Sequence, residues 1–410
     1  MKRIIFHVDV NNAFLSWTAV KLLSEGKKDI RKVEAIIAGD ESTRHGIVLA
    51  KSPVAKKKGV KTAMTIYEAK KLCPNLEIYK GDFKWYFECS NKMMDYLKRY
   101  SPTIEQFSID ECFIDMTGTN YLYKDYVKLA NKIKDEIKEQ FGFTVNVGIA
   151  ENKLCAKMAS DFEKPDKVHT LFSDEIVKKL WPLDVGELFM VGKSTKEKLY
   201  SMNIKTINDL AHYDENKLKT KFKSMATYLH NAAWGIDDKE VVTEKEDRKS
   251  VSTEKTLPKD ENDRETLRNI LFSESVEVSN ELRKKKMYAK TVGIIYKDIK
   301  FKKYSREITL DNPTSTTKEI ANIVEELFNS TYNDELIRLI GIRLSNLKNN
   351  KEEQLSIFDE PIEEKNDEFQ ETIDKINEKF GKNLIEPASL KVIGRTNSKN
   401  SYYNEKNKKI

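Results

Sequence analysis

The sequence predicts an α+β multidomain protein, and three features along the chain indicate this fold class. Across residues 1–165, the expected strands and helices follow the order strand, helix, two strands, helix, strand. That order is typical of a ferredoxin-like sheet with helices packed against it. The chain then changes to short helical segments, and a second group of strands and helices begins near residue 250.

The ferredoxin-like part is predicted from apolar runs and from helical periodicity. The expected strands are 2–10, 144–149 and the two arms of a hairpin at 104–116. The expected helices are 13–25, 82–100, 121–141 and 151–162. Gly26 ends the first of these helices, as glycine commonly does.

A small region is inserted between the first two helices. Strand patterns at 33–38 and 46–50 precede a lysine-rich stretch at 51–61, in which Gly59 ends a short helix. A solvated lysine face is the ordinary interpretation of such a stretch. By itself it indicates no function.

The rest of the chain divides by composition. Short helices are expected across 183–221, and a charged linker follows at 237–248. Strand patterns then recur, with helices between them, at 249–256, 291–296, 304–310 and 336–344. Residues 348–410 are polar and rich in lysine and asparagine, a composition typical of flexible segments.

The overall composition is that of a globular cytoplasmic protein. The chain has 410 residues, a net charge of +6 and a pI near 8.7, which permit a nucleic-acid partner without requiring one. The four cysteines show no disulfide-like or metal-binding spacing, as expected in a reducing compartment. No apolar run approaches the roughly 20 residues that cross a bilayer.

Two adjacent acids, Asp110 and Glu111, lie at the centre of the expected hairpin. The segment has no basic residue to pair with them, and buried carboxylates need a pair or a metal ion. Oxygen ligands favour magnesium or manganese over zinc. The alternative is a solvent-exposed hairpin tip with two surface acids, and this stretch alone favours that alternative.

A third acid favours the metal site over the exposed hairpin tip. Asp9 lies at the C-terminal end of the first strand, where chemistry is often found in mixed α/β folds. If this strand neighbours the hairpin, then Asp9, Asp110 and Glu111 form a cluster able to hold two metal ions about 4 Å apart.

The motif D-V-N-N-A-F near the N-terminus, together with S-I-D-E about a hundred residues later, resembles the Y-family DNA polymerases. The resemblance extends from about residue 3 to about residue 348. It implies a right-hand polymerase architecture in which Asp9, Asp110 and Glu111 are catalytic metal ligands for two Mg²⁺ ions, with Mn²⁺ as a possible substitute. The carbonyl of Val10 would be a further ligand.

The resemblance also implies contacts to the incoming nucleotide. Phe14 would be the steric gate that excludes ribonucleotides, although a core position in the first helix is the alternative for this residue. The nucleotide-binding residues would be Asn11, Asn12, Ala13, Phe14, Lys56 and Lys164. Two departures from the family pattern affect this site: Pro53 replaces the usual tyrosine, and Asp166 and Lys167 follow Pro165 without the usual glycine.

DNA contacts are expected in two places. Val191, Gly192 and Lys193 resemble a helix-hairpin-helix, whose backbone amides bind a DNA phosphate without reading bases. Met190 stands where the first hairpin glycine is usual. Between 283 and 306 there are ten basic residues and one acid, so this block should bind phosphates in a salt-dependent way. The DNA-binding residues would be Gly192, Lys193, Lys284, Lys285, Lys286, Lys302 and Lys303.

The implied domains are a ferredoxin-like palm at 1–30 and 79–165, small fingers at 31–78, a helix-hairpin-helix thumb at 166–236, an α/β little finger at 242–348, and a flexible tail at 349–410. The tail carries Gln354, Leu355, Ile357 and Phe358, which resemble the short peptide that binds the bacterial sliding clamp. A chance match is the alternative for so short a motif.

The predicted function is template-directed, low-fidelity translesion DNA synthesis by two-metal catalysis, without proofreading. Its partners would be primer-template DNA, deoxynucleoside triphosphates and the sliding clamp, and we expect a monomer. Two alternatives come from other classes: a nucleotidyl cyclase built on the same kind of sheet, and a non-catalytic protein that binds clamp and DNA.

Overall fold

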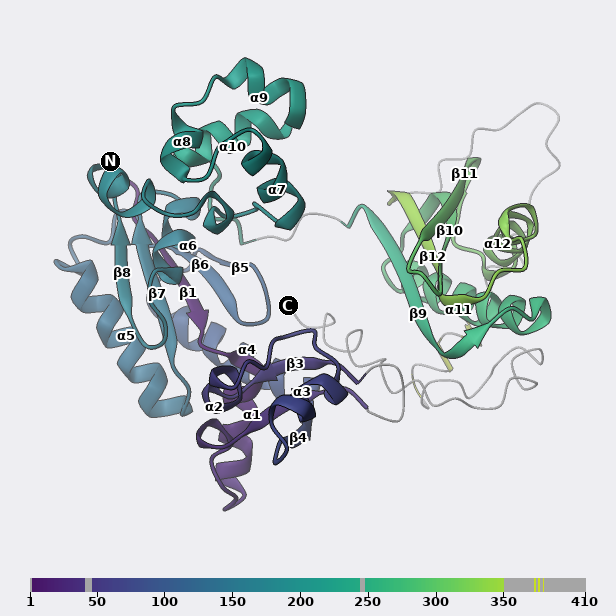
Figure 1. Cartoon of the computed structure of the whole chain (residues 1–410), viewed down its shortest axis with the longest axis horizontal. Coiled ribbons are helices and arrows are strands. Elements are labelled where there is room, and N and C mark those ends of the chain that lie inside the picture. Colours follow the sequence, from purple (N-terminus) through teal and green to yellow (C-terminus); the bar gives the residue numbers. More distant parts are fainter. Residues whose placement is uncertain are drawn as a thin grey trace. The chain divides into compact units, whose positions relative to one another are not determined.

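The computed structural model describes residues 2–40, 46–243 and 248–349, together with positions 372, 373, 375, 376 and 379. These residues fall into two units, which we treat separately (Figure 1). The first unit contains the described residues up to 243, and the second contains those from 248 onward.

A five-stranded sheet forms the centre of the first unit, in the order β5-β6-β1-β7-β8. Its strands are β1 Ile5–Val10, β5 Ile104–Gln106, β6 Glu111–Asp115, β7 Val145–Ala150 and β8 Val168–Leu171. β1 pairs antiparallel with β6 on one side and with β7 on the other. The predicted ferredoxin-like sheet is therefore confirmed, and β8 is an additional parallel edge strand that the sequence patterns did not reveal.

Helices cover both faces of this sheet. They are α1 Ala13–Ser24, α4 Phe83–Leu97, α5 Tyr126–Phe141 and α6 Lys153–Asp161. Residues of α1, α4 and α5 share one core with Phe6 and Val8 of β1, whereas α6 belongs to a separate core with Ile5 and Phe113. In Figure 1, α5 runs along the sheet beside β7 and β8.

The start of α5 corrects one prediction. Helical periodicity indicated a helix from residue 121, but α5 begins at Tyr126 because Asp125 caps it. The Asp125 carboxylate accepts a hydrogen bond from the backbone amide of Lys128 at 3.0 Å, a typical N-cap. Tyr121 and Leu122 therefore lie in the preceding turn, where both are exposed.

The inserted region is a three-stranded sheet with two short helices. The sheet has the order β3-β2-β4, with β2 Ala35–Ala38, β3 Val48–Lys51 and β4 Glu77–Lys80. The helices are α2 Pro53–Lys57 and α3 Ile66–Leu72, and a 3₁₀ turn, η1 Ile30–Lys32, precedes β2. The parallel strand β4 was not predicted from the sequence.

A helical segment completes the first unit. Its elements are η2 Ser173–Glu175, η3 Ile176–Leu180, η4 Val185–Glu187, α7 Lys193–Ser201, α8 Ile207–Ala211, α9 Glu215–Phe222 and α10 Met225–Ala233. The core of this segment is continuous with α6, so the segment packs on the α6 face of the five-stranded sheet.

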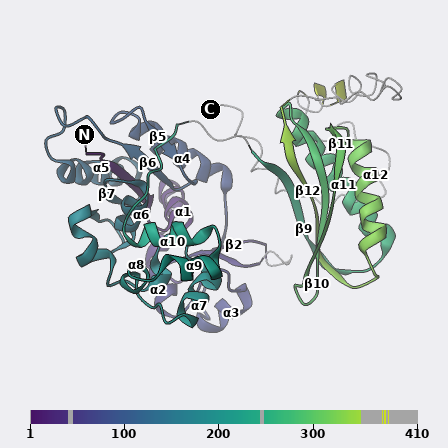
Figure 2. The ribbon, with the colours of Figure 1, turned by 90° about the horizontal axis from the view of Figure 1, so that it is seen from above.

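The second unit is a four-stranded antiparallel sheet in the order β11-β10-β12-β9. Its elements are β9 Ser250–Glu261, α11 Arg264–Lys284, β10 Tyr288–Asp298, β11 Lys303–Thr314, α12 Thr317–Thr331 and β12 Ile337–Lys348. The helices α11 and α12 lie side by side against this sheet (Figure 2).

All four strands of the second unit are longer than predicted. The sequence D-N-P at 311–313 is a turn signal, so periodicity ended the predicted strand at residue 310. In the structure, β11 is an edge strand and continues to Thr314, because an edge position tolerates the missing amide of Pro313. Within the described part of the chain, no helix is long and apolar enough to span a membrane.

Candidate active site

The pairing of β1 with β6 brings the predicted acids into one region. Asp9 is the direct partner of Glu111, and opposed residues of antiparallel strands project their side chains to the same face. Asp110 lies in the bend just before β6, and its carbonyl accepts a hydrogen bond from the Val10 amide at 2.9 Å. The Ser108 hydroxyl donates to Asp110 Oδ1 at 2.6 Å. The strand adjacency on which the prediction depended is therefore present.

Two basic side chains approach one oxygen of Glu111. Lys157 of α6 donates to Oε2, and Nε2 of His7 on β1 lies 3.1 Å from the same oxygen. Burial alone would raise the pKa of Glu111, but His7 and Lys157 outweigh burial and lower that pKa to about 2. Glu111 is therefore ionised at any physiological pH.

Asp9 has a different environment at the end of β1. It is 9% exposed, and its carboxylate accepts a hydrogen bond from Lys164. Burial raises the pKa of Asp9, and the charge of Lys164 only partly opposes this effect. Lys164 also contacts Asp161 at 2.7 Å, so one lysine is shared by two acids.

The donor set suits a hard divalent cation, because it consists of carboxylate oxygens. In the arrangement observed, however, the described residues include no group of three or more His, Cys, Asp or Glu side chains placed to hold a metal ion. Lys157 and Lys164 occupy one oxygen each of Glu111 and Asp9. Metal binding by Asp9, Val10, Asp110 and Glu111 therefore stays a prediction.

Phe14 lies on the first turn of α1 and is half-buried. Its ring stacks on Tyr86 of α4, with the ring centroids 4.8 Å apart and the planes 15° apart. Phe83 meets Phe14 edge-on at 5.8 Å. The ring is thus fixed by neighbours while part of it faces solvent, which is compatible with a steric gate and with a position at the edge of the core.

The start of α1 offers free backbone amides. Asn12 has a left-handed backbone conformation, φ 52°, which asparagine tolerates well, and its side chain donates to the Lys51 carbonyl rather than capping the helix. The first-turn amides of Ala13 and Phe14 therefore have no hydrogen-bond acceptor within the described residues. Such amides are a common anion-binding site at a helix N-terminus.

Asn11 contributes to the site in a different way. Its amide nitrogen donates to the Thr144 carbonyl, and its side chain bonds Asn146 at 3.0 Å and the backbone of Asp166 at 2.9 Å. The loop after Pro165 is therefore fixed to the start of α1 through Asn11. Asp166, which has φ 63°, also bonds Lys134 at 2.9 Å.

The helix α2 explains the departure at Pro53. Proline is favourable at the first position of a helix, and the Ser52 hydroxyl caps α2 by accepting the Ala55 amide at 3.0 Å. Lys56 is exposed on this helix and forms no ion pair with any described residue. The Lys51 ammonium donates to a neutral hydroxyl, that of Thr62, at 2.8 Å.

The predicted hairpin at 190–193 precedes α7. Met190 has φ 68°, the left-handed conformation that glycine adopts without strain, so the usual glycine pattern has a physical reason at this position. Gly192 is the N-cap residue of α7 and has open space around its Cα, and Lys193 begins the helix. Both residues are exposed, as a DNA-phosphate contact requires.

The basic residues of the second unit lie at element ends. Lys284 ends α11, Lys285 and Lys286 follow it, and Lys302 and Lys303 lie where β11 begins. Lys285 is half-buried and bonds Glu281 at 2.7 Å, and the other four are exposed. The predicted clamp motif, Gln354, Leu355, Ile357 and Phe358, lies outside the described residues.

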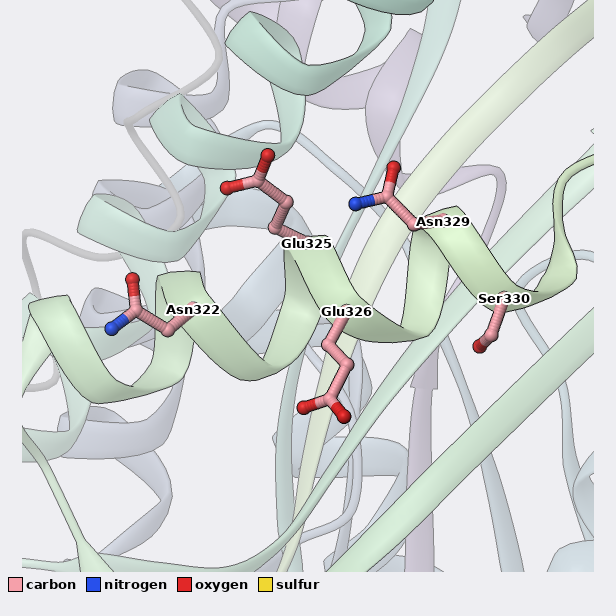
Figure 3. Close-up of a pocket in the computed structure, with 5 residues that line it drawn as sticks. All are labelled: Asn322, Glu325, Glu326, Asn329 and Ser330. Carbon is pink, nitrogen blue, oxygen red and sulfur yellow. The ribbon is translucent and has the colours of Figure 1, made fainter.

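A polar hollow of about 620 Å³ lies on the outer face of α12 (Figure 3). It is lined by Asn322, Glu325, Glu326, Asn329 and Ser330. All five side chains come from one helix, and Arg268 contacts Glu325 and Asn329. The hollow contains none of the predicted site residues.

Sequence reasoning missed three residues that contact the carboxylates or their partners: His7, Lys157 and Ser160. A signal for two of them was present, because Lys153, Lys157 and Ser160 recur at spacings that place them on one helical face. Lys153 bonds Glu105 of β5 at 2.6 Å, so this face of α6 is directed toward the hairpin. No pattern distinguished His7 within its apolar strand.

Three family models match the chain. Residues 8–161 match the impB/mucB/samB family, and residues 248–357 match the C-terminal domain of that family. Residues 187–237 match a model described as the thumb domain of DNA polymerase-iota.

Similar curated proteins cover nearly the whole chain. A DNA polymerase IV of Clostridium acetobutylicum is 45% identical over 386 residues, which are 94% of this chain and 97% of that protein. A DNA polymerase IV of Acetivibrio thermocellus is 35% identical over 388 residues, covering 93% of this chain and 96% of the relative.

Solved structures show the same architecture. A Y-family DNA polymerase chimera of Dbh and Dpo4 matches with a TM-score of 0.71 and 25% identity, covering 85% of this chain and all of that one. An insertion ternary complex of Dbh DNA polymerase matches in fold, with a TM-score of 0.58 and 24% identity over the same share of this chain.

Proposed function

The chain belongs to the Y-family DNA polymerases, and from this premise we propose that Asp9, Asp110 and Glu111 form its catalytic centre. The protein is a DNA-directed DNA polymerase of the translesion type, similar to DNA polymerase IV. The observation that carries the assignment of the centre is the pairing of Asp9 with Glu111 across β1 and β6, beside the bend that contains Asp110.

The reaction joins the 3′-hydroxyl oxygen of the primer to the α-phosphorus of a deoxynucleoside triphosphate. The bond to the β-phosphate oxygen breaks, pyrophosphate leaves, and the hydroxyl proton is released to water. Divalent cations, when bound, supply charge neutralisation and lower the pKa of the primer hydroxyl. This family requires such cations, and we propose Mg²⁺, with Mn²⁺ as a substitute, because the donors are oxygens.

The protein supplies position and charge. Asp9, Asp110, Glu111 and the Val10 carbonyl would hold the ions, and burial on one face of a rigid sheet favours a fixed geometry. Lys164 now contacts Asp9 and Asp161. The phosphate contact that we propose for Lys164 requires it to exchange Asp9 for a phosphate oxygen.

The incoming nucleotide would lie over the start of α1. The free amides of Ala13 and Phe14 suit a phosphate, Asn11 and Asn12 fix the backbone that presents them, and Lys56 adds a positive charge. Phe14 would then contact the sugar from its solvent side, as a steric gate.

Primer-template DNA would contact both units. Gly192 and Lys193 are proposed to bind a backbone phosphate through the amides that begin α7. The lysines at the end of α11 and the start of β11 would bind further phosphates, so affinity for DNA should fall steeply with salt. The domain boundaries inferred from the sequence are proposed for this chain on the same basis.

The sliding clamp is a further proposed partner, through Gln354, Leu355, Ile357 and Phe358. A tethered peptide raises the local enzyme concentration at the clamp, so processive synthesis should depend on it. Changing both Leu355 and Phe358 to alanine should reduce clamp-stimulated extension to the clamp-free level and leave distributive extension unchanged. Full stimulation of the double variant would place the docking surface elsewhere. We infer a monomer, since the proposed centre comes from one chain, and a cytoplasmic location, since the four cysteines show no disulfide-like spacing.

The decisive test of the centre is Asp110→Asn. Loss of one charged ligand should lower primer extension by about two to three orders of magnitude, with DNA affinity nearly unchanged. Asp115→Asn is the matched control, because Asp115 ends β6, the strand that follows Asp110, and within the described part of the chain its carboxylate accepts only the Thr117 amide. Extension by Asp110→Asn at the rate of the control would show that the assigned centre is wrong.

A further inference from the structure

We propose that His7 is a positioning residue that fixes the carboxylate of Glu111. His7 is fully buried, with its Nε2 3.1 Å from Glu111 Oε2 and its Nδ1 2.8 Å from the Ser160 hydroxyl. The inference rests on the proposed function, because it takes Glu111 as a ligand of the catalytic ions. His7 itself would touch neither substrate nor metal.

The sheet register explains how His7 reaches both partners. On β1, His7 is paired with Phe113 of β6 and with Gly148 of β7, and its ring lies 4.7 Å from that of Phe113. A Cβ at residue 148 would lie 1.9 Å from the Ala156 carbonyl, so only glycine allows α6 to approach the sheet this closely. The close approach brings Ser160 to the inner nitrogen of His7.

The hydrogen-bond chain determines the tautomer of His7. A neutral imidazole carries one N–H, and the nitrogen that faces an ionised carboxylate must be the one that carries it. Nε2 is then the donor, and Nδ1 accepts from the Ser160 hydroxyl. The Ser160 hydroxyl also donates to the Lys157 carbonyl at 2.8 Å, so its single proton is shared between that carbonyl and Nδ1.

The consequence for Glu111 is that only one of its two carboxylate oxygens is contacted by these side chains. His7 and Lys157 both contact Oε2, and no contact of Oε1 is found among the described residues. One oxygen is thus anchored and the other is left for a cation. Nε2 of His7 lies within hydrogen-bond distance of Oε2 but forms no aligned hydrogen bond with it, so the contact observed is a close electrostatic one.

His7 and Lys157 have different parts in this arrangement. The lysine reaches Oε2 through four flexible methylene groups, whereas the imidazole ring is enclosed between two strands and a helix. A buried donor with a fixed ring resists rotation of the carboxylate. Partners of this kind, one step behind a metal ligand, commonly change metal affinity or activity by about 10- to 100-fold when they are removed.

Two substitutions distinguish the effect of losing the N–H donor from the effect of losing side-chain volume. In His7→Gln the side-chain amide nitrogen occupies nearly the position of Nε2 and can still donate to Glu111. In His7→Asn the shorter amide reaches only the position of Nδ1 and leaves Glu111 without its buried donor. Both variants are polar and smaller than histidine, and asparagine leaves the larger cavity at this buried site, so circular dichroism of both variants accompanies the binding measurement. His169→Gln is the matched control, because His169 lies across Gly148 on β8 and contacts no proposed ligand.

The test measures Mn²⁺ binding to the full chain by electron paramagnetic resonance, together with kcat and KM in primer extension. His7→Asn should weaken Mn²⁺ binding by about 10- to 100-fold and lower kcat, with little change in the KM for nucleotide. His7→Gln and His169→Gln should bind Mn²⁺ within about threefold of the native protein. Native Mn²⁺ binding by His7→Asn, or equal losses in His7→Asn and His7→Gln, would overturn the proposal.

A further variant covers the case in which His7→Asn does not fold. Ser160→Ala removes the partner of Nδ1 together with the hydroxyl's bond to the Lys157 carbonyl within α6, so it should weaken Mn²⁺ binding severalfold while circular dichroism remains native. Unchanged binding would again overturn the proposal. Asp110→Asn is run in parallel: if it retains Mn²⁺ affinity and extension, then the proposed centre fails, whereas failure of the His7 variants alone leaves that centre intact.

Discussion

Replacing Gly148 by alanine tests whether the packing of α6 controls the active site. Gly148 lies in β7, and a Cβ there would be 1.9 Å from the Ala156 carbonyl oxygen and 2.5 Å from the Ser160 nitrogen. Both obstacles are backbone atoms of α6, so no side chain can rotate away. Because carbon atoms do not approach such neighbours closer than about 3 Å, the helix would have to move outward by about 1 Å.

The expected magnitude follows from this displacement. Overpacking a core costs about 1–3 kcal/mol, and a clash with backbone belongs at the upper end of that range. For a unit of this size, 1 kcal/mol corresponds to about 2–4 °C in Tm, so Gly148→Ala should lower the Tm by roughly 6–12 °C. Lys157 and Ser160 would move with α6, and a shift of about 1 Å near a reacting centre can reduce the rate about 100-fold.

The assay is thermal unfolding followed by circular dichroism, with primer extension measured well below the new Tm. Gly293→Ala is a matched control, since Gly293 also lies inside a strand but its added Cβ would come no closer than 3.1 Å to any neighbour. The control should lose little stability and keep its extension rate. The reasoning is refuted if Gly148→Ala unfolds and extends primers as the native protein does.

Two further predictions concern individual side chains. Phe14→Ala should raise ribonucleotide incorporation at least tenfold, which corresponds to about 1.4 kcal/mol of lost discrimination between the two sugars. The assay compares matched ribo- and deoxynucleotides. Unchanged sugar selectivity at normal activity would assign Phe14 to the core. Met190→Gly should raise the free energy of unfolding in urea by about 0.5–1 kcal/mol, because relief of the strain at φ 68° exceeds the entropy that glycine adds to the unfolded chain. The Met190 side chain is 60% exposed, so its removal costs little packing. A lower urea midpoint would contradict this prediction.

Sequence patterns were sufficient for the main elements of the first sheet. The apolar run that ends in Asp9 and the paired runs around Asp110 are long enough to identify strands, and both lie where the structure has them. The short strands β4 and β8 were not predicted because they are only partly buried and contain no apolar run, whereas the equally short β2 is apolar throughout and fully buried. The start of α5 was misjudged because a single cap, Asp125, outweighed a continuing helical pattern.

The candidate site was predictable to the extent that its residues are costly to bury. Carboxylates at strand ends are conspicuous in a sequence, because they must have a cation or a donor as partner. The partners themselves are not conspicuous: His7 looks like an interruption of an apolar strand, and Ser160 like a small helical residue. What brings them together is the register of three strands and the missing side chain at Gly148, and neither is visible in composition or periodicity. A glycine that binds nothing therefore determines how closely α6 approaches the carboxylates, and so which atoms can hold Glu111.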